Sequence, residues 1–182
     1  MKAKRKIQTD LIHAGEEEKV DHSVVFPIFQ SATFVSQDET AYEDIRYLRL
    51  NNTPNHRVLN AKLASVCCGE AAVVTSSGMA AISATLLSLL KTGDHVLVQN
   101  CLYGGTHSLF VEDLPDFGIA VDFIDGNQPE SWAEKIREKT RVIFVETMTN
   151  PLLEVADHEA VVVFARNHGL IAVVDNTFGT PI

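Results

Sequence analysis

The sequence predicts an α/β fold in which a mostly parallel sheet is sandwiched between helices, preceded by an extended N-terminal arm. From residue 56 onward, helix-like patterns alternate with short β-branched runs, and two of these runs, at 142–145 and 171–174, are apolar throughout. A strand without a polar face must be buried on both sides, which is typical of parallel sheets covered by helices. The connections between such strands are right-handed crossovers.

The first elements expected after the arm are a helix, a strand and a longer helix. Residues 56–67 place apolar side chains on one helical face, and Gly69 ends the pattern. Residues 71–75 form an apolar run of strand length. Residues 77–91 form a long apolar segment that stops before Gly93, so a second helix is expected there.

Strands and helices alternate through the rest of the chain. The strands are expected at 95–99, 119–124, 141–146 and 170–175. The helices between them are expected at 106–113, 129–139 and 157–167. The helix at 129–139 has a proline in its first turn and four charged residues on its solvent face: Glu134, Lys135, Glu138 and Lys139.

Residues 1–55 differ from the rest of the chain. They are polar, contain Pro27 and Pro54, and show no sustained apolar period. We expect residues 1–55 to form an arm for subunit contacts and residues 56–182 to form the first part of a larger domain. Because this arm has too little apolar periodicity to pack on its own domain, the chain is expected to be a homo-oligomer, a dimer or a tetramer.

The composition excludes two classes of partner. Of the 182 residues, 46% are apolar and 21% are charged, and the formal net charge is −9. An acidic chain repels phosphate backbones and anionic lipids, so neither nucleic acid nor a membrane is expected as a partner. The apolar runs are also much too short to span a bilayer.

Three cysteines are present: Cys67, Cys68 and Cys101. An odd number with one adjacent pair and no C-x-x-C spacing indicates neither a disulfide framework nor a metal site, and no metal is expected. A reducing, cytoplasmic location fits this pattern best. Cys67 and Cys68 are expected to fill the core rather than to carry chemistry.

Ligands of open parallel sheets bind beyond the carboxyl ends of the strands. There, Ser77, Gly78 and Met79 precede a predicted helix, whose free amide groups and positive dipole end could seat a phosphate or carboxylate. Ser77 as a helix cap and Gly78 as a packing residue explain the segment equally well. No G-x-G-x-x-G, P-loop, G-x-S-x-G or H-E-x-x-H motif occurs, so the corresponding enzyme classes lose their main support.

Asp175 and Tyr103 are candidate catalytic residues at two other strand ends. A carboxylate after an apolar strand could cap the next turn, or it could hold a cationic ring nitrogen, which is what pyridoxal phosphate needs to act as an electron sink. Tyr103 is followed by two glycines that would let the chain approach a ring closely. Taken alone, each residue also fits an ordinary structural role.

The order of five segments is more specific than any one of them. They are Tyr-Leu-Arg at 47–49, Ser-Ser-Gly-Met-Ala-Ala at 76–81, Leu-Tyr-Gly-Gly-Thr at 102–106, Glu-Thr-Met-Thr-Asn-Pro at 146–151 and Asp-Asn-Thr-Phe at 175–178. Together they resemble the Cys/Met-metabolism family of pyridoxal-phosphate enzymes. This family includes cystathionine γ-synthase, cystathionine lyases, methionine γ-lyase and O-acylhomoserine sulfhydrylases.

The resemblance implies a fold similar to the large domain of fold type I enzymes, and a role for each matching residue. Pyridoxal 5'-phosphate is the implied cofactor. Its phosphate would be held at Ser77, Gly78 and Met79, and its ring by the side chains of Tyr103, Asn150, Asp175 and Thr177. Glu146 would support this neighbourhood, although a structural role fits it nearly as well. Tyr47 and Arg49 would reach into the neighbouring subunit and bind the cofactor phosphate there, since the planar guanidinium can hold two phosphate oxygens.

The implied activity is a β- or γ-elimination, or a γ-replacement, on a small amino acid such as cystathionine, cysteine, methionine or O-acylhomoserine. One element of the family pattern is missing, because no lysine of this sequence lies in the Ser-x-Thr-Lys context that carries the cofactor lysine in the family. The sequence also stops at Ile182, directly after a ligand loop, so a partial chain that is catalytically silent by itself is expected. The alternative is a non-catalytic cofactor-binding or assembly module, and a Ser-x-Thr-Lys motif in the downstream reading frame would decide between the two.

Overall fold

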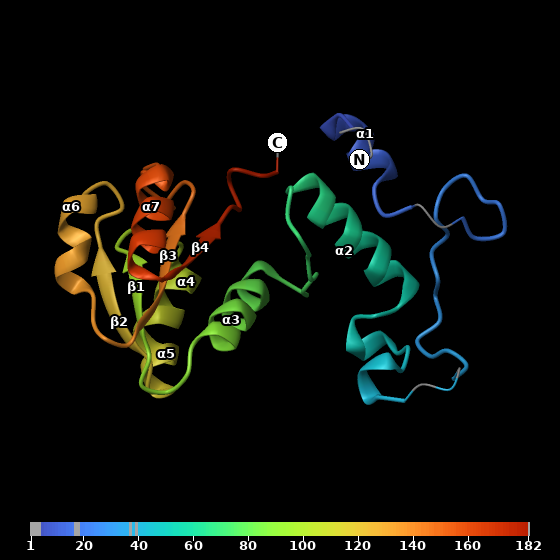
Figure 1. Cartoon of the computed structure of the whole chain (residues 1–182), viewed down its shortest axis with the longest axis horizontal. Coiled ribbons are helices and arrows are strands. Elements are labelled where there is room, and N and C mark those ends of the chain that lie inside the picture. Colours follow the sequence, from blue (N-terminus) through green and yellow to red (C-terminus); the bar gives the residue numbers. More distant parts are fainter. Residues whose placement is uncertain (1–4, 17–18, 37, 39, 182) are drawn as a thin grey trace. The chain divides into compact units, whose positions relative to one another are not determined.

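The computed structural model describes residues 5–16, 19–36, 38 and 40–181. The chain divides into two compact units, of which one comprises the described residues up to Val74 together with Pro181, and the other comprises Thr75–Thr180 (Figure 1). The second unit contains the sheet. The boundary after residue 55 that the sequence suggests stays a prediction.

Four parallel strands form the sheet in the order β2-β1-β3-β4. They are β1 (His95–Gln99), β2 (Ala120–Ile124), β3 (Thr140–Glu146) and β4 (Ile171–Asp175). Each lies within one residue of its sequence-predicted range. In the register of the sheet, Glu146 at the end of β3 pairs with Asp175 at the end of β4, so the two carboxyl groups emerge side by side.

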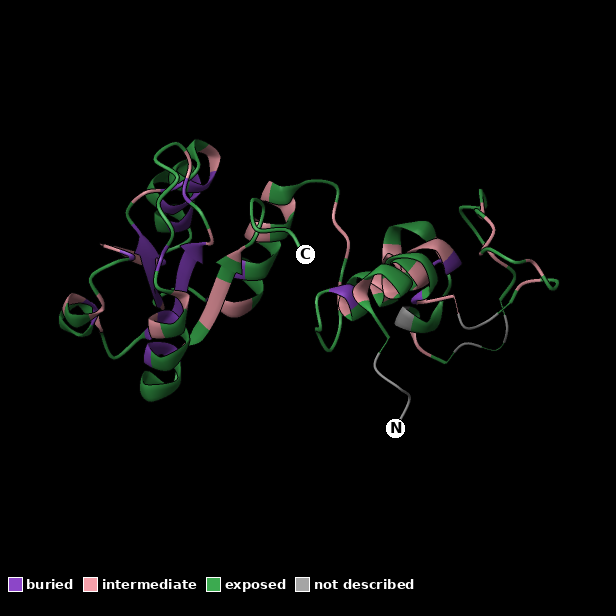
Figure 2. Ribbon diagram, turned by 90° about the horizontal axis from the view of Figure 1, so that it is seen from above, coloured by how far each residue is buried: buried purple, intermediate pink, exposed green. Residues whose placement is uncertain are grey.

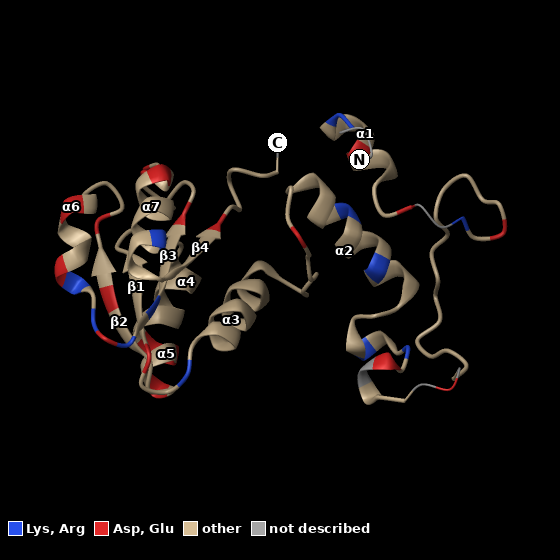
Figure 3. Cartoon of the chain, in the orientation of Figure 1, with Lys and Arg blue, Asp and Glu red and all other residues tan. Residues whose placement is uncertain are grey.

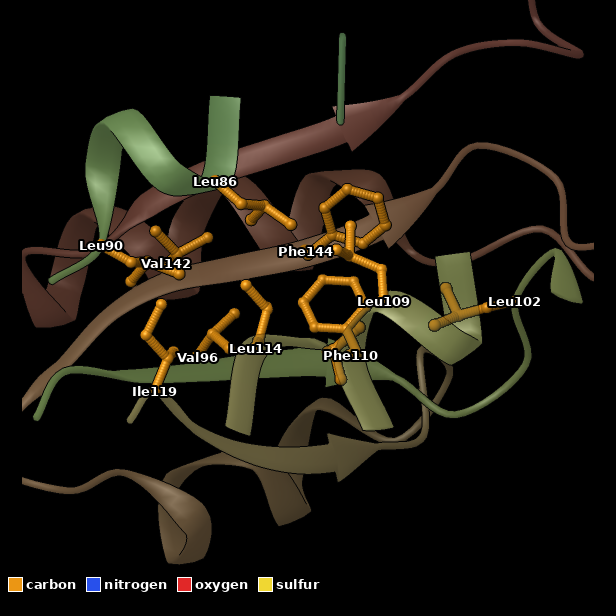
Figure 4. Packing of buried hydrophobic residues seen from close by; sticks show 11 residues of the cluster. Leu86, Leu90, Val96, Leu102, Leu109, Phe110, Leu114, Ile119, Val142 and Phe144 are labelled. Carbon is orange, nitrogen blue, oxygen red and sulfur yellow. The ribbon is translucent and has the colours of Figure 1, made fainter. Parts of the chain in front are cut away.

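Helices cover both faces of this sheet, as the fold prediction requires. Alternate residues of β1 and β3 point to opposite faces. On one face, Val96 and Phe144 pack with Leu86 of α3 (Gly78–Leu89). Phe110 and Phe144 lie with their ring centroids 5.1 Å apart in the centre of this cluster (Figure 4).

The opposite face is covered by α6 (Pro129–Trp132) and α7 (His158–His168). There Trp132 packs edge-on against Phe164, with the ring centroids 5.3 Å apart. The Trp132 indole N–H donates to the carbonyl oxygen of Asp125 at 2.6 Å. Since both faces are covered, the strands of the central pair are buried, and buried residues concentrate there (Figure 2).

Two predicted helices are divided in the structure. The segment expected as one helix at 106–113 becomes α4 (Gly104–Ser108), a π-helical turn η3 (Leu109–Asp113) and α5 (Leu114–Asp116). The helix expected at 129–139 is shorter, because α6 passes into the 3₁₀ turn η4 (Ala133–Lys135) and then ends. Ile136 is already extended, with φ −69° and ψ 134°, which lets residues 137–139 run into β3.

Two strand predictions are corrected. Residues 71–75 form no strand in the described structure, because side chains bond the main chain of Val74: Asn60 accepts from its N–H at 3.0 Å and Asn51 donates to its carbonyl at 2.7 Å. Strand β4 is not buried on both sides as its apolar sequence suggests. It pairs only with β3 at the edge of the described sheet, and Ile171 and Val174 stay 47% and 41% exposed.

The first unit contains short helical elements separated by long irregular segments. Its elements are α1 (Ile7–His13), two 3₁₀ turns η1 (Tyr42–Asp44) and η2 (Leu48–Leu50), and α2 (Pro54–Val66). Helix α1 lies within the stretch expected to be an extended arm. Gly15 (φ +78°) lets the chain return along α2 so closely that a Cβ atom would lie 2.5 Å from the Val58 carbonyl oxygen.

The adjacent cysteines at the end of α2 are also corrected. Both Cys67 and Cys68 are exposed, and neither belongs to the core as the sequence suggests. The helix ends at Val66, and its apolar side is narrower than the pattern over residues 56–67 implies, since Leu59 and Leu63 are 43% and 37% exposed. Among the described residues, no helix is both long and apolar enough to cross a membrane.

Candidate functional site

A cavity of about 400 Å³ opens where the carboxyl ends of the strands meet the N-terminus of α3. It lies within the unit Thr75–Thr180. Its walls are Ser77, Gly78, Met79, Ile82, Tyr103, Glu146, Met148, Asn150, Asp175, Thr177 and Phe178. Strands β3 and β4 both end in acidic residues at this edge (Figure 3). The size is typical of sites for small ligands.

The N-terminus of α3 forms one wall of the cavity. Ser77 is extended and caps the helix, with its Oγ accepting from the Ala80 N–H at 3.1 Å. Thr75 fixes the approach by donating its hydroxyl to the Ser77 carbonyl at 2.8 Å. The first N–H groups of a helix have no partner inside the helix, so those of Gly78 and Met79 are available to an anion. A Cβ atom on Gly78 would meet nothing within 4 Å, which shows how open this end is.

Tyr103 forms the wall that follows β1. Its backbone N–H donates to Oε1 of Glu146 at 2.9 Å, and its side chain is 51% exposed toward the cavity side. The absence of a side chain at Gly105 leaves room for the Tyr103 ring, because a Cβ atom at this position would lie 2.8 Å from Tyr103 Cε1 and 3.3 Å from the Met79 sulfur. The Thr106 hydroxyl donates to the same sulfur at 3.8 Å. The loop therefore holds Tyr103 and Met79 together on one side of the cavity.

Asp175 occupies the end of β4 and is locked by the residues that follow it. One oxygen, Oδ1, accepts from the backbone N–H and from the hydroxyl of Thr177, at 3.0 and 2.6 Å. The Asp175 carbonyl accepts from the Thr147 N–H at 2.9 Å, which ties the loop after β3 to the same strand. These bonds fix the direction of the carboxylate at the cavity wall.

Glu146 is the buried acid of the site, only 4% exposed. Burial raises its pKa above the usual value of 4.5, and the negative charge of Asp175 adds to this rise; the N–H groups of Tyr103 and Asn150 oppose it by stabilising the carboxylate. Its own N–H donates to Oε1 of the buried Gln99 at 3.0 Å. Glu146 therefore holds a proton more readily than an exposed glutamate does.

Seven of the nine cofactor-binding residues predicted from the sequence line this one cavity: Ser77, Gly78, Met79, Tyr103, Asn150, Asp175 and Thr177. The other two, Tyr47 and Arg49, lie in the other unit. There the Arg49 guanidinium donates to the Tyr47 hydroxyl at 3.2 Å and lies 5.1 Å from the centre of its ring, so the two side chains form a pair.

Three further residues close the cavity and were not predicted as site residues: Ile82, Met148 and Phe178. Ile82 lies one helical turn beyond Gly78 and Met79, so it shares their face of α3. Met148 and Phe178 lie inside the segments at 146–151 and 175–178 that carried the resemblance. A search for apolar residues beside the predicted polar ones would have found all three.

Comparison with known proteins identifies the family. The model of the family "Cys/Met metabolism PLP-dependent enzyme" matches residues 8–182. A probable cystathionine gamma-synthase of Herpetosiphon aurantiacus is 41% identical over 177 residues, which cover 95% of this chain and 54% of that protein. An L-methionine gamma-lyase of Fusobacterium nucleatum subsp. polymorphum is 41% identical over 182 residues, which cover 95% of this chain and 46% of that protein.

Solved structures agree with the sequence relatives. The cystathionine gamma-lyase of Lactobacillus plantarum, complexed with L-serine, superposes with a TM-score of 0.88 at 34% identity, over 97% of this chain and 46% of that one. A putative O-acetylhomoserine (thiol)-lyase of Campylobacter jejuni, which carries N'-pyridoxyl-lysine-5'-monophosphate, gives 0.89 at 30% identity, over 97% and 45%. This chain spans about half the length of the relatives it matches. The matches confirm the predicted family, fold class and cofactor, and the chain belongs to the Cys/Met metabolism family of PLP-dependent enzymes.

Proposed function

We propose that the cavity at the ends of β1, β3 and β4 binds pyridoxal phosphate, and that this chain is the N-terminal, cofactor-binding part of a lyase or transferase of sulfur amino-acid metabolism. The observation that carries the proposal is the convergence of seven predicted residues, far apart in the sequence, on one cavity. The ends of parallel strands meet at one edge of any such sheet. What favours cofactor binding over separate capping and packing roles is that a helix N-terminus, an aromatic ring and a fixed carboxylate all line the same cavity.

The residues of the cavity fit the cofactor group by group. The phosphate suits the capped N-terminus of α3, where the N–H groups of Gly78 and Met79 and the nearby Ser77 face the opening. The ring suits the space beside Tyr103, whose aromatic face can stack on it. Asp175 supplies a fixed anion for the pyridine nitrogen at the end of β4.

The two remaining predicted residues of the cavity, Thr177 and Asn150, complete the fit. Thr177 holds Oδ1 of Asp175 through two hydrogen bonds, which keeps that carboxylate directed at the site. Asn150 lines the cavity from the loop after β3, where its amide can bond the ring hydroxyl.

Bound pyridoxal phosphate supplies an electron sink for the carbanion that forms when an amino acid loses its α-proton. In this chain, Asp175 keeps the proton on the ring nitrogen, and Thr177 prevents the carboxylate from turning away. Tyr103 and Met79 line the same side of the cavity. Glu146 accepts a hydrogen bond from the Tyr103 N–H, which fixes the backbone that carries the ring.

The substrate class we propose is a small sulfur-containing or O-acylated amino acid. The relatives are named as enzymes that make or cleave cystathionine, methionine, homocysteine or cysteine. Cleavage or replacement at the β- or γ-carbon follows from the carbanion chemistry that the site would support. These activities belong to the whole protein, since this chain spans only about half the length of those relatives.

We further propose that the protein is a homo-oligomer in which Tyr47 and Arg49 bind the cofactor phosphate of a neighbouring subunit. The two side chains are already paired with each other, which leaves less rotamer entropy to lose when an anion binds. Sedimentation at micromolar concentration should give a dimer or a larger species. Arg49→Gln should weaken cofactor binding and leave the unfolding of the chain unchanged. A folded monomer whose affinity for the cofactor is the same with and without this substitution would contradict the arm exchange.

The central test is the affinity for pyridoxal phosphate measured by equilibrium dialysis. Asp175→Ala removes a charge-assisted bond worth about 1.5–3 kcal/mol, which corresponds to a loss of about 10- to 140-fold in affinity. Asp116→Ala is the matched control, since it removes the same charge from an exposed residue at the end of α5 that does not line the cavity. Equal affinities of the two variants would overturn the proposal.

A non-catalytic cofactor-binding module is the second candidate, and one observation favours it for the chain by itself. Among the described residues, the cavity wall contains no lysine that could bond the cofactor covalently. Borohydride treatment of the chain with pyridoxal phosphate should therefore leave no stoichiometric adduct by intact mass, and no pyruvate or 2-oxobutyrate should form from cysteine, cystathionine or methionine. An adduct on one lysine together with turnover would exclude the module.

A further inference from the structure

The adjacent thiols at the end of α2 have no role in the proposed cofactor site. Cys67 and Cys68 are both free and both exposed. Helix α2 contributes no residue to the cavity wall. The third cysteine, Cys101, follows β1 in the other unit, is only half exposed and has no thiol neighbour in sequence.

The backbone at this point is a well-formed helix end rather than a fraying tail. Cys67 is the C-cap, with φ −82° and ψ 3°, and its N–H donates to the Leu63 carbonyl at 2.9 Å. The Cys68 N–H donates to the Ser65 carbonyl at 3.2 Å, and the Gly69 N–H to the Ala64 carbonyl at 2.8 Å. These last two bonds are the pair that defines a Schellman motif. They hold the two thiol-bearing residues in one conformation.

The residue with left-handed backbone conformation in this motif is a cysteine rather than the usual glycine. Cys68 has a φ of +53°, at the position where glycine is the common residue. A side chain at that φ is strained, and glycine would remove the strain at once. Such strain is a reason to look for chemistry at the residue that bears it. What the cysteine adds over glycine here is a second thiol beside the first.

Two neighbouring, exposed thiols favour a soft ligand that takes both of them. We propose that Cys67 and Cys68 form a dithiol site for trivalent arsenicals. Soft thiolate ligands select soft acceptors. The first arsenic–sulfur bond places the second thiol beside the same arsenic atom, so ring closure is intramolecular and strengthens binding by a factor on the order of 10² or more over one thiol.

The reaction balances without any oxidant or reductant. An organic arsenous acid, R–As(OH)₂, exchanges its two hydroxyl groups for the two cysteine sulfurs. Two As–O bonds and two S–H bonds break, two As–S bonds form, and the two hydroxyl groups leave with the thiol protons as two water molecules. Neither arsenic nor sulfur changes its oxidation state.

The test uses phenylarsonous acid with the full chain and intact mass under native conditions. We expect one phenylarsenic adduct per chain, with a mass that corresponds to the loss of two waters. Cys67→Ser and Cys68→Ser should each weaken binding by about 10² or more, since each leaves a single thiol. Cys101→Ser is the matched control and should bind as the parent chain does.

A second variant keeps the test decisive if a serine disturbs the helix end. Cys68→Gly removes one thiol and suits the left-handed backbone, so it should fold at least as well as the parent chain and still lose the adduct. A dithiol such as 2,3-dimercaptopropanol should release the bound arsenic, whereas an equal thiol concentration of a monothiol should not. An adduct that survives in Cys68→Gly, that resides on Cys101, or that a monothiol removes would overturn the proposal.

Discussion

Replacing Gly105 by alanine should lower the affinity for pyridoxal phosphate and raise the free energy of unfolding. In Gly105→Ala the new Cβ atom would lie 2.8 Å from Tyr103 Cε1, whereas ordinary contacts begin at 3.4 Å. The edge of the ring must therefore retreat by the difference, 3.4 − 2.8, or about 0.6 Å. Because the Tyr103 side chain is 51% exposed, it can swing outward with little loss of packing.

The expected effect on binding follows from the stacking that this retreat disrupts. Aromatic pairs contribute about 0.5–1.5 kcal/mol beyond their buried area, so the affinity for pyridoxal phosphate should fall by about 2- to 10-fold. Stability should move in the opposite direction. Gly105 lies in α4, and replacing a helical glycine by alanine adds up to about 1 kcal/mol to the free energy of unfolding.

The assay pairs equilibrium dialysis of the cofactor with urea unfolding of the same preparations. Gly104→Ala is the matched control, because it lies in the same helix and its Cβ atom would meet nothing within 4 Å. It should leave the affinity unchanged. The reasoning is refuted if Gly105→Ala binds the cofactor as tightly as the parent chain, or if Gly104→Ala weakens binding as much.

Three further predictions concern stability, each measured by urea unfolding. Glu146→Gln should gain stability relative to the parent chain as pH rises above 4.5. Because the pKa of Glu146 is raised in the fold, the stability that its protonated side chain contributes is complete below pH 4.5 and is lost as the buried acid ionises. A difference in unfolding free energy between the two chains that stays constant from pH 4 to 8 would contradict this. Burial lowers the pKa of His95 below 6.5, so the stability that its neutral side chain contributes is complete above pH 6.5 and is lost as pH falls. His95→Gln should therefore flatten the decline of stability in acid, whereas His22→Gln, at an exposed position, should not. Ser77→Ala removes the cap of α3 and should cost about 1 kcal/mol, whereas exposed Ser88→Ala in the same helix should change stability by less than about 0.5 kcal/mol.

Most of the strands and helices could be predicted because the apolar patterns that indicate them lie within short stretches of the sequence. The apolar run at 142–145 indicates a strand buried on both faces, and β3 is buried on both. The polar residues that follow β3 and β4 had to meet, since parallel strands end at one edge of their sheet. The resemblance implies that Asn150 and Asp175 belong to one site, and both line the cavity.

Other features depended on partners that a local pattern does not contain. The apolar run at 171–174 looks like the run at 142–145, yet β4 is partly exposed because it lies at the edge of the described sheet. The segment at 71–75 has the composition of a strand, but the side chains of Asn51 and Asn60 take the main-chain bonds of Val74. Burial and hydrogen bonding are properties of neighbours, which the tertiary structure alone provides.

The same reason separates the two acids of the site. Glu146 and Asp175 are both the last residues of their strands, and nothing in the local sequence pattern assigns them different surroundings. The fold buries Glu146 beside Gln99 and leaves Asp175 half exposed and bonded to Thr177. Residue type and order determined which groups reach the strand ends. Only the packing around Glu146 raised the pKa of its carboxyl group, because the cost of a charge is set by the water that its surroundings exclude.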